Sequence, residues 1–162
     1  MPLARDALLR EMHTAFQAVL RHLQGLDYAL DWREGPEEWS ARDIVDHLLG
    51  TEDSGILFHL GRALRGEPIT PNPGHLSRSP QRRAMDIQAL RRALTDTYQE
   101  VIRLVQEASP QQWERKVRLV RPQGVQEIDP EGVVRRFFIA HWNEHARQLA
   151  SLQERLGIVM ED

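Results

Sequence analysis

The sequence predicts an all-α protein, with residues 1–162 forming a single domain. The expected fold is a four-helix bundle with long crossover connections and a small hairpin-like insert before the last helix. In four long segments, apolar residues recur three and four positions apart, which is the spacing of one helix face. Three of these segments follow residues that typically begin helices. A chain of this length can also bury a sizeable core without disulfides or metals.

The first predicted helix covers residues 3–30. Its apolar stripe consists of Leu8, Leu9, Met12, Phe16, Val19, Leu20 and Leu23. Gly35 and Pro36 then interrupt the helical pattern. The second predicted helix covers residues 40–62. It begins at Ser40, which has Asp43 three positions later, as in a capping box.

A long crossover loop is expected over residues 66–80, which contain four prolines and two glycines. This segment is not expected to be a linker between domains, because neither flank could form a bundle alone. Ser79 has the character of a helix N-cap, and Pro80 that of a first helical residue. The third predicted helix therefore covers residues 80–107.

Residues 116–128 differ from the helical segments on either side. Apolar residues flank a Pro-Gln-Gly turn there, which predicts a short β-hairpin or an extended loop. Asp129 and Pro130 again have the character of an N-cap followed by a first helical residue. The fourth predicted helix therefore covers residues 130–156 and follows the insert directly.

The composition excludes several classes of function. The chain has no cysteine, so it can form no disulfide, thiolate nucleophile, iron–sulfur cluster or cysteine-type zinc site. Its 21 basic and 24 acidic residues give a net charge of -3, which argues against a nucleic-acid binder. No apolar run approaches the ~18 residues of a membrane span. We see no signal peptide and expect a cytoplasmic protein without membrane contact.

Two histidines lie on the inward stripe of the fourth predicted helix. This stripe consists of Val134, Phe138, His141, His145, Leu149, Leu152 and Leu156. Side chains four residues apart on a helix have Cβ atoms roughly 5–6 Å apart, so both imidazoles can bind one metal ion. Two buried imidazoles need polar partners. The pair therefore indicates either metal binding or a structural polar layer.

His47 is the candidate for a third ligand. It lies at the border of the apolar stripe of the second predicted helix, beside Ile44 and Thr51. A further histidine from a facing helix would complete a three-histidine site with open coordination positions, the arrangement of catalytic metal sites. Periodicity alone gives His47 only weak support.

The other polar candidates are expected to be solvated or structural. His59 lies near the end of the second predicted helix, where it would interact favourably with the helix dipole. Three carboxylates near the candidate ligands could hydrogen-bond to them, and Glu144 could instead be a general base, but solvated side chains are the simpler interpretation. The remaining histidines are His13, His22 and His75, and the three carboxylates are Glu52, Asp53 and Glu144.

Two segments resemble motifs of the DinB-like (DinB/YfiT) superfamily. Residues 39–52 read Trp-Ser-Ala-Arg-Asp-Ile-Val-Asp-His-Leu-Leu-Gly-Thr-Glu. The family's second helix has the same Trp-Ser start, apolar pair and His-Leu step. Residues 141–149 read His-Trp-Asn-Glu-His-Ala-Arg-Gln-Leu, which is similar to the H-x-x-x-H of the family's last helix. The resemblance extends in order over nearly the whole chain.

This resemblance implies a four-helix bundle that binds a divalent metal ion through His47, His141 and His145. Zinc or nickel is the foremost expectation for the metal, and iron is a further option. Characterised relatives include transferases and isomerases that use a low-molecular-weight thiol such as bacillithiol, mycothiol or glutathione. The resemblance also implies a small-molecule substrate and a homodimer.

Two hypotheses from different classes follow. In the first, the protein is a metal-dependent thiol S-transferase or isomerase, in which the metal lowers the pKa of a substrate thiol. In the second, it is a non-catalytic metal-stabilised bundle or a stress-linked binding protein. Metal affinity should in either case fall below about pH 6.5, because histidine ligates as the neutral imidazole.

Overall fold

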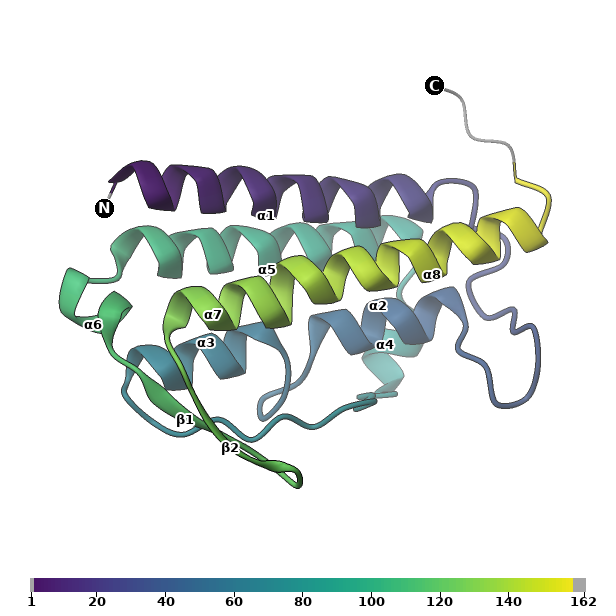
Figure 1. Cartoon of the computed structure of the whole chain (residues 1–162). Coiled ribbons are helices and arrows are strands. Elements are labelled where there is room, and N and C mark those ends of the chain that lie inside the picture. Colours follow the sequence, from purple (N-terminus) through teal and green to yellow (C-terminus); the bar gives the residue numbers. More distant parts are fainter. Residues whose placement is uncertain (1, 159–162) are drawn as a thin grey trace.

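Three long helices and one pair of short helices build the bundle (Figure 1). The computed structural model describes residues 2–158 of the chain. Two short consecutive helices, α2 and α3, share the fourth position of the bundle. The five helices are α1 (Pro2–Leu23), α2 (Ala41–Leu49), α3 (Ile56–Leu64), α5 (Ile87–Glu107) and α8 (His141–Arg155).

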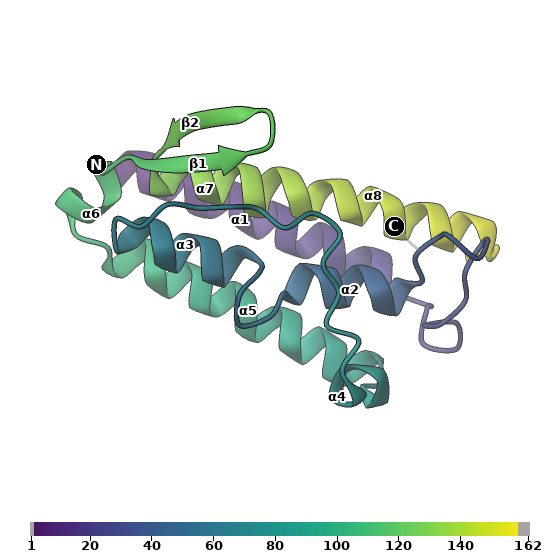
Figure 2. The same ribbon diagram turned by 90° about the horizontal axis from the view of Figure 1, so that it is seen from below.

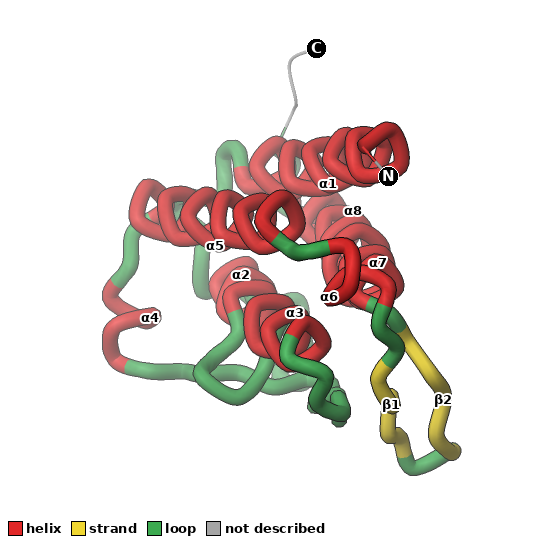
Figure 3. Tube along the Cα trace, turned by 90° about the vertical axis from the view of Figure 1, so that its left-hand side faces the viewer, coloured by secondary structure: helices red, strands yellow, loops and turns green. Residues whose placement is uncertain are grey.

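The helices pack around one apolar core. Figure 3 shows their arrangement from one end of the bundle. Helix α1 contacts α5 and α8, α2 contacts α5 and α8, and α3 contacts α5 and α7 (Pro130–Val134). Every position of the bundle contributes fully buried side chains, among them Leu8, Leu48, Leu90 and Trp142. The four-helix bundle predicted from the sequence is confirmed. None of the helices in residues 2–158 is long and apolar enough to cross a membrane.

The predicted insert is a β-hairpin between α6 (Pro110–Glu114) and α7. Strands β1 (Val117–Arg121) and β2 (Gly124–Ile128) pair antiparallel, with the first residue of β1 opposite the last residue of β2. The alternative of an unpaired extended loop is therefore wrong.

The crossover loop between α3 and α4 (Pro80–Ala84) runs beside this hairpin (Figure 2). Ile69 donates its backbone N–H to the carbonyl of Arg118 at 2.8 Å and accepts from the N–H of Val120 at 2.8 Å. Ile69 is also fully buried. The hairpin thus holds one end of the crossover loop against the bundle.

The second predicted helix, 40–62, is interrupted, which corrects the prediction of one continuous helix. Ser40 caps α2 with the expected capping box, but α2 ends at Leu49 and α3 begins only at Ile56. Gly50 has φ 71° and ψ -165°, and Gly55 has φ 101°, conformations that favour glycine. The two glycines form the break, and apolar spacing continues across it.

Replacing Gly50 with alanine is expected to lower the free energy of unfolding by about 2 kcal/mol. A Cβ atom at Gly50 would lie 2.3 Å from the backbone oxygen of Ser54, in addition to the strained backbone angle. Urea denaturation measures the effect. Gly74→Ala is the matched control, because Gly74 also has a positive φ but its added Cβ would meet nothing within 4 Å. Equal losses in the two variants would contradict this account.

Two further boundaries differ from the sequence prediction. The first helix ends at Leu23 rather than residue 30, because Gly25 adopts φ 78° and the chain turns there. The third predicted helix is divided into α4 and α5. Asp86 lies between them and caps α5 by accepting a hydrogen bond from the N–H of Ala89 at 2.8 Å.

The fourth predicted helix is continuous but not uniform. Helix α7 leads into a π-helical segment, Arg135–Ala140, and α8 follows directly at His141. π-Helical turns are rare in proteins, and many of those that occur lie at functional sites. In this chain the π-helical segment ends at the first of the two histidines predicted to be ligands.

Candidate metal centre

The three histidines selected from the sequence lie together. His47 is in the last turn of α2, His141 is the first residue of α8, and His145 follows one turn later. The Nε2 atom of His141 lies 2.9 Å from Nε2 of His47 and 3.0 Å from Nε2 of His145. One potential ligand atom from each residue lies within 4.8 Å of the others.

The other ring nitrogen of each histidine has an oxygen acceptor. Nδ1–H of His47 donates to the backbone carbonyl of His75 at 3.0 Å, and Nδ1–H of His145 donates to Oε1 of Gln148 at 2.7 Å. His141 bonds the backbone of Phe137. With Nδ1 protonated in each neutral ring, three Nε2 lone pairs face one another.

This donor set fits a divalent cation. Two Nε2 lone pairs cannot form a hydrogen bond with each other, so the cluster needs either a proton or a cation between them. Nitrogens bound to zinc in a tetrahedral site lie roughly 3.3 Å apart, since each Zn–N bond is about 2.0–2.1 Å. The two spacings from Nε2 of His141 are close to this value. Oxygen acceptors for the second ring nitrogen are the usual support for histidine ligands.

Burial lowers the pKa of two of the three rings. It is the largest cause that lowers the pKa of His47. Burial, followed by the neighbouring charges of His145 and His47, lowers the pKa of His141 to about 3. Both rings are therefore unprotonated at neutral pH, which is the form that binds metals.

Trp39 packs against two of the three rings. Its ring centroid lies 4.9 Å from that of His47 and 6.0 Å from that of His145. In the structure Trp39 restricts the orientation of the two imidazoles, and it lies immediately before the Ser40 cap of α2.

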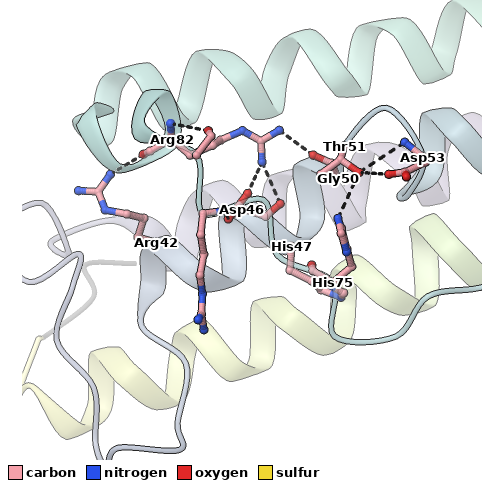
Figure 4. A network of polar contacts seen from close by, with 10 residues as sticks. Arg42, Asp46, His47, Gly50, Thr51, Asp53, His75 and Arg82 are labelled. Carbon is pink, nitrogen blue, oxygen red and sulfur yellow. Dashed lines mark hydrogen bonds and ion pairs between the residues drawn. The ribbon is translucent and has the colours of Figure 1, made fainter.

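A chain of hydrogen bonds orders the loop that supports His47 (Figure 4). Nδ2 of Asn72 donates to Nδ1 of His75 at 3.1 Å, and Nε2–H of His75 donates to Oγ1 of Thr51 at 3.3 Å. Thr51 in turn donates to Oδ1 of Asp53 at 2.8 Å. Asp53 thus supports the site only indirectly, through the loop whose carbonyl holds His47.

Asp46, the residue before His47, anchors the crossover loop and α4 to α2 (Figure 4). Its carboxylate is buried, pairs with the guanidinium of Arg82 and accepts the backbone N–H of Arg78 at 2.8 Å. Arg82 also donates to the carbonyls of Asp46 at 3.0 Å and Gly50 at 2.7 Å. One arginine therefore holds the end of α2, where His47 lies.

A cleft of about 770 Å³ opens beside the three histidines. Residues from the α2–α3 region, the crossover loop, the hairpin turn, the π-helical segment and α8 line it. Glu144 lines this cleft, whereas Glu52 is an exposed residue outside it. The cleft is large enough for a small molecule in contact with the histidine cluster.

His59 also lines the cleft and lies in the middle of α3 rather than at a helix C-terminus, which corrects the expected interaction with the helix dipole. Only 4% of the residue is exposed, and its Nδ1 atom is buried without a hydrogen-bond partner. The ring packs against Phe58 and Phe137, with centroids 5.6 and 5.2 Å away. Its position three residues after Ile56 is the signal that could have placed it on the inner face of α3.

His59 is expected to make the metal-free protein less stable in acid. Burial lowers its pKa from 6.5 to about 4, so the unfolded chain binds a proton between these values and the folded chain does not. The free energy of unfolding should therefore fall as the pH drops from 6.5 to 4. His59→Leu should reduce this pH dependence in urea denaturation, whereas substitution of the exposed His13 should not. Identical pH dependence in wild type and His59→Leu would contradict the prediction.

The other two histidines lie away from the cluster. His13 is exposed, and its Nδ1 lies 3.2 Å from the hydroxyl of Tyr98. Nδ1 of His22 lies 2.8 Å from Oε1 of Gln153. Both histidines lie on α1, and their partners lie on α5 and α8. His13 is exposed as expected, whereas His22 is half-buried against the buried Gln153, which corrects the expectation that it is solvated.

Fold and site together define a class: helical bundles in which three histidines from two helices meet at a cleft. The chain belongs to the DinB superfamily, whose sequence model matches residues 8–149. No curated protein sequence matches the chain.

A solved structure shares the fold. YfiT from Bacillus subtilis, described as a probable metal-dependent hydrolase with an unusual four-helix bundle topology, aligns with a TM-score of 0.73. The alignment covers 95% of this chain and 88% of that chain, at 18% sequence identity. At this identity the likeness establishes the fold alone.

Proposed function

We propose that the protein is a metal-dependent enzyme that binds a divalent cation, zinc or nickel, through Nε2 of His47, His141 and His145. One observation carries the proposal: the three Nε2 atoms converge while an oxygen acceptor occupies each Nδ1. Three protein ligands leave coordination positions open beside the cleft. A cation bound there would supply Lewis acidity and lower the pKa of a thiol or water that it coordinates.

The reaction we favour is transfer or isomerisation with a low-molecular-weight thiol. The family includes thiol-dependent transferases and isomerases, and this chain has no cysteine, so the substrate would bring the sulfur. Glu144 is the only carboxylate among the described residues that line the cleft. Its carboxylate is therefore the group placed to accept the thiol proton, while the neutral histidines hold the cation and Trp39 restricts their rings.

Hydrolysis is the second candidate. It is favoured by the likeness to the B. subtilis YfiT structure, which is described as a probable metal-dependent hydrolase. The same cluster and the same carboxylate would serve, with water in place of the thiol. The two candidates differ in the nucleophile and hence in the product formed.

The test uses zinc- or nickel-loaded protein and two reactions. In the first, 1-chloro-2,4-dinitrobenzene is supplied with glutathione or bacillithiol, and formation of the thioether is followed by absorbance. In the second, p-nitrophenyl acetate is supplied without thiol, and release of nitrophenolate is followed. Thiol-dependent turnover that Glu144→Gln slows without loss of metal supports the favoured reaction. Turnover only in the second assay supports hydrolysis.

A bound metal without turnover in either assay would favour the non-catalytic hypothesis. In that case the metal should raise the thermal unfolding temperature of the wild type, because a ligand that binds only the folded state stabilises it. The single alanine variants of His47, His141 and His145 should lose that increase in unfolding temperature.

A further inference from the structure

Two arginines in the cleft have no partner. Arg121, the last residue of β1, and Arg136, in the π-helical segment, both line it. Within residues 2–158, neither side chain forms a hydrogen bond or an ion pair. The two residues come from elements far apart in sequence, yet both line the same cavity as the three histidines.

Two other arginines, Arg135 and Arg62, do pair with acidic side chains. Arg135, adjacent to Arg136, pairs with Glu11 at 2.6 Å and with Glu131 at 3.5 Å. Arg62 on α3 pairs with Glu67 at 3.2 Å. Acidic partners thus neutralise Arg135 and Arg62, whereas Arg121 and Arg136 keep uncompensated charge at the cleft.

The charge of the cleft is strongly positive once a cation is bound. Two guanidiniums and a divalent cation would then face the single carboxylate of Glu144. The chain as a whole has a formal net charge of -3, so this positive charge is local. Such a concentration of charge inside a concave site attracts anions.

His59 adds an unpartnered polar group to the same cavity. It is 4% exposed, and its Nδ1 is buried without a partner. Within the described part of the chain, the ring of His59 makes no hydrogen bond. A buried polar group without a partner in a cavity wall indicates that a ligand or water completes its hydrogen bonding.

We propose that the cleft binds a small organic anion whose carboxylate or phosphate group is held by Arg121 and Arg136. The planar guanidinium forms paired hydrogen bonds with such oxyanions. The rest of the molecule lies along the cleft between the arginines and the histidine cluster, beside His59. The inference deepens the proposed function, on which it rests, by naming the substrate class of that site.

The test is calorimetric titration of zinc-loaded protein with malonate and, separately, with inorganic phosphate at low ionic strength. Arg121→Gln and Arg136→Gln should each weaken binding roughly tenfold, and the double variant should weaken it more. Arg118→Gln on the same strand and Arg147→Gln on α8 are controls, because both arginines are exposed outside the cleft. The stronger response, to malonate or to phosphate, identifies the oxyanion.

The zinc content of every variant separates this inference from the proposed function. If zinc binds fully and the double variant binds both anions as tightly as the wild type, the anion site is wrong although the metal site is right. If zinc does not bind, the metal-dependent function is wrong. The same titrations are then made on zinc-free protein, and the inference holds only if Arg121→Gln and Arg136→Gln weaken anion binding there.

Discussion

Replacing His47, His141 or His145 with alanine is expected to abolish most metal binding. The wild-type protein, purified without a polyhistidine tag, should contain one zinc or nickel ion per chain. Each variant should retain less than about a tenth of that metal, because two remaining imidazoles make a poor site for a cation that takes four ligands. Elemental analysis after dialysis measures the stoichiometry directly.

The exposed His13 provides the control, since His13→Ala removes an imidazole from the surface and should leave the metal content unchanged. Full occupancy in His47→Ala alone would show that His47 is not a ligand. Full occupancy in all three variants would reduce the cluster to a buried polar layer and remove the main support for the enzyme.

Replacing Arg82 with methionine is expected to lower the free energy of unfolding by about 3–5 kcal/mol. The change leaves the carboxylate of Asp46 buried without its cation and removes the donors to the carbonyls of Asp46 and Gly50. Because these bonds hold the end of α2, metal affinity should fall as well. Urea denaturation and competition with a chelator measure the two effects.

Arg83→Met is the matched control, because Arg83 lies on the same short helix but is exposed. Adding Asp46→Asn to Arg82→Met should recover part of the lost stability, since it removes the uncompensated charge. A loss below about 1 kcal/mol in Arg82→Met would show that this ion pair contributes little.

The sequence predicted those features of the fold that depend on local patterns. The apolar spacings and the Ser40 cap identified the bundle, and the Pro-Gln-Gly turn indicated the hairpin. The break between α2 and α3 escaped prediction because Ile56 and Leu60 continue the spacing of the residues before Gly50. A single sequence does not distinguish such an interruption from a tolerated glycine.

The candidate ligands could be selected from the sequence because their residue type and their spacing are visible in it. His141 and His145 interrupt an apolar stripe, and the family motif brought in His47. The residues that hold these ligands in position were harder to predict from the sequence. Asp46 and Arg82 lie 36 positions apart and meet only after the crossover loop folds back. No local sequence pattern predicts that contact.

The carbonyl of His75 gives the site an unusual genetic property. Every residue has a backbone carbonyl, so alanine at position 75 would remove the side-chain bonds to Asn72 and Thr51 but keep the carbonyl that holds His47. The number of residues between Ile69, held by the hairpin, and Arg78, held by Asp46, decides where that carbonyl lies. Insertions or deletions in this interval should therefore be selected against more strongly than substitutions at position 75.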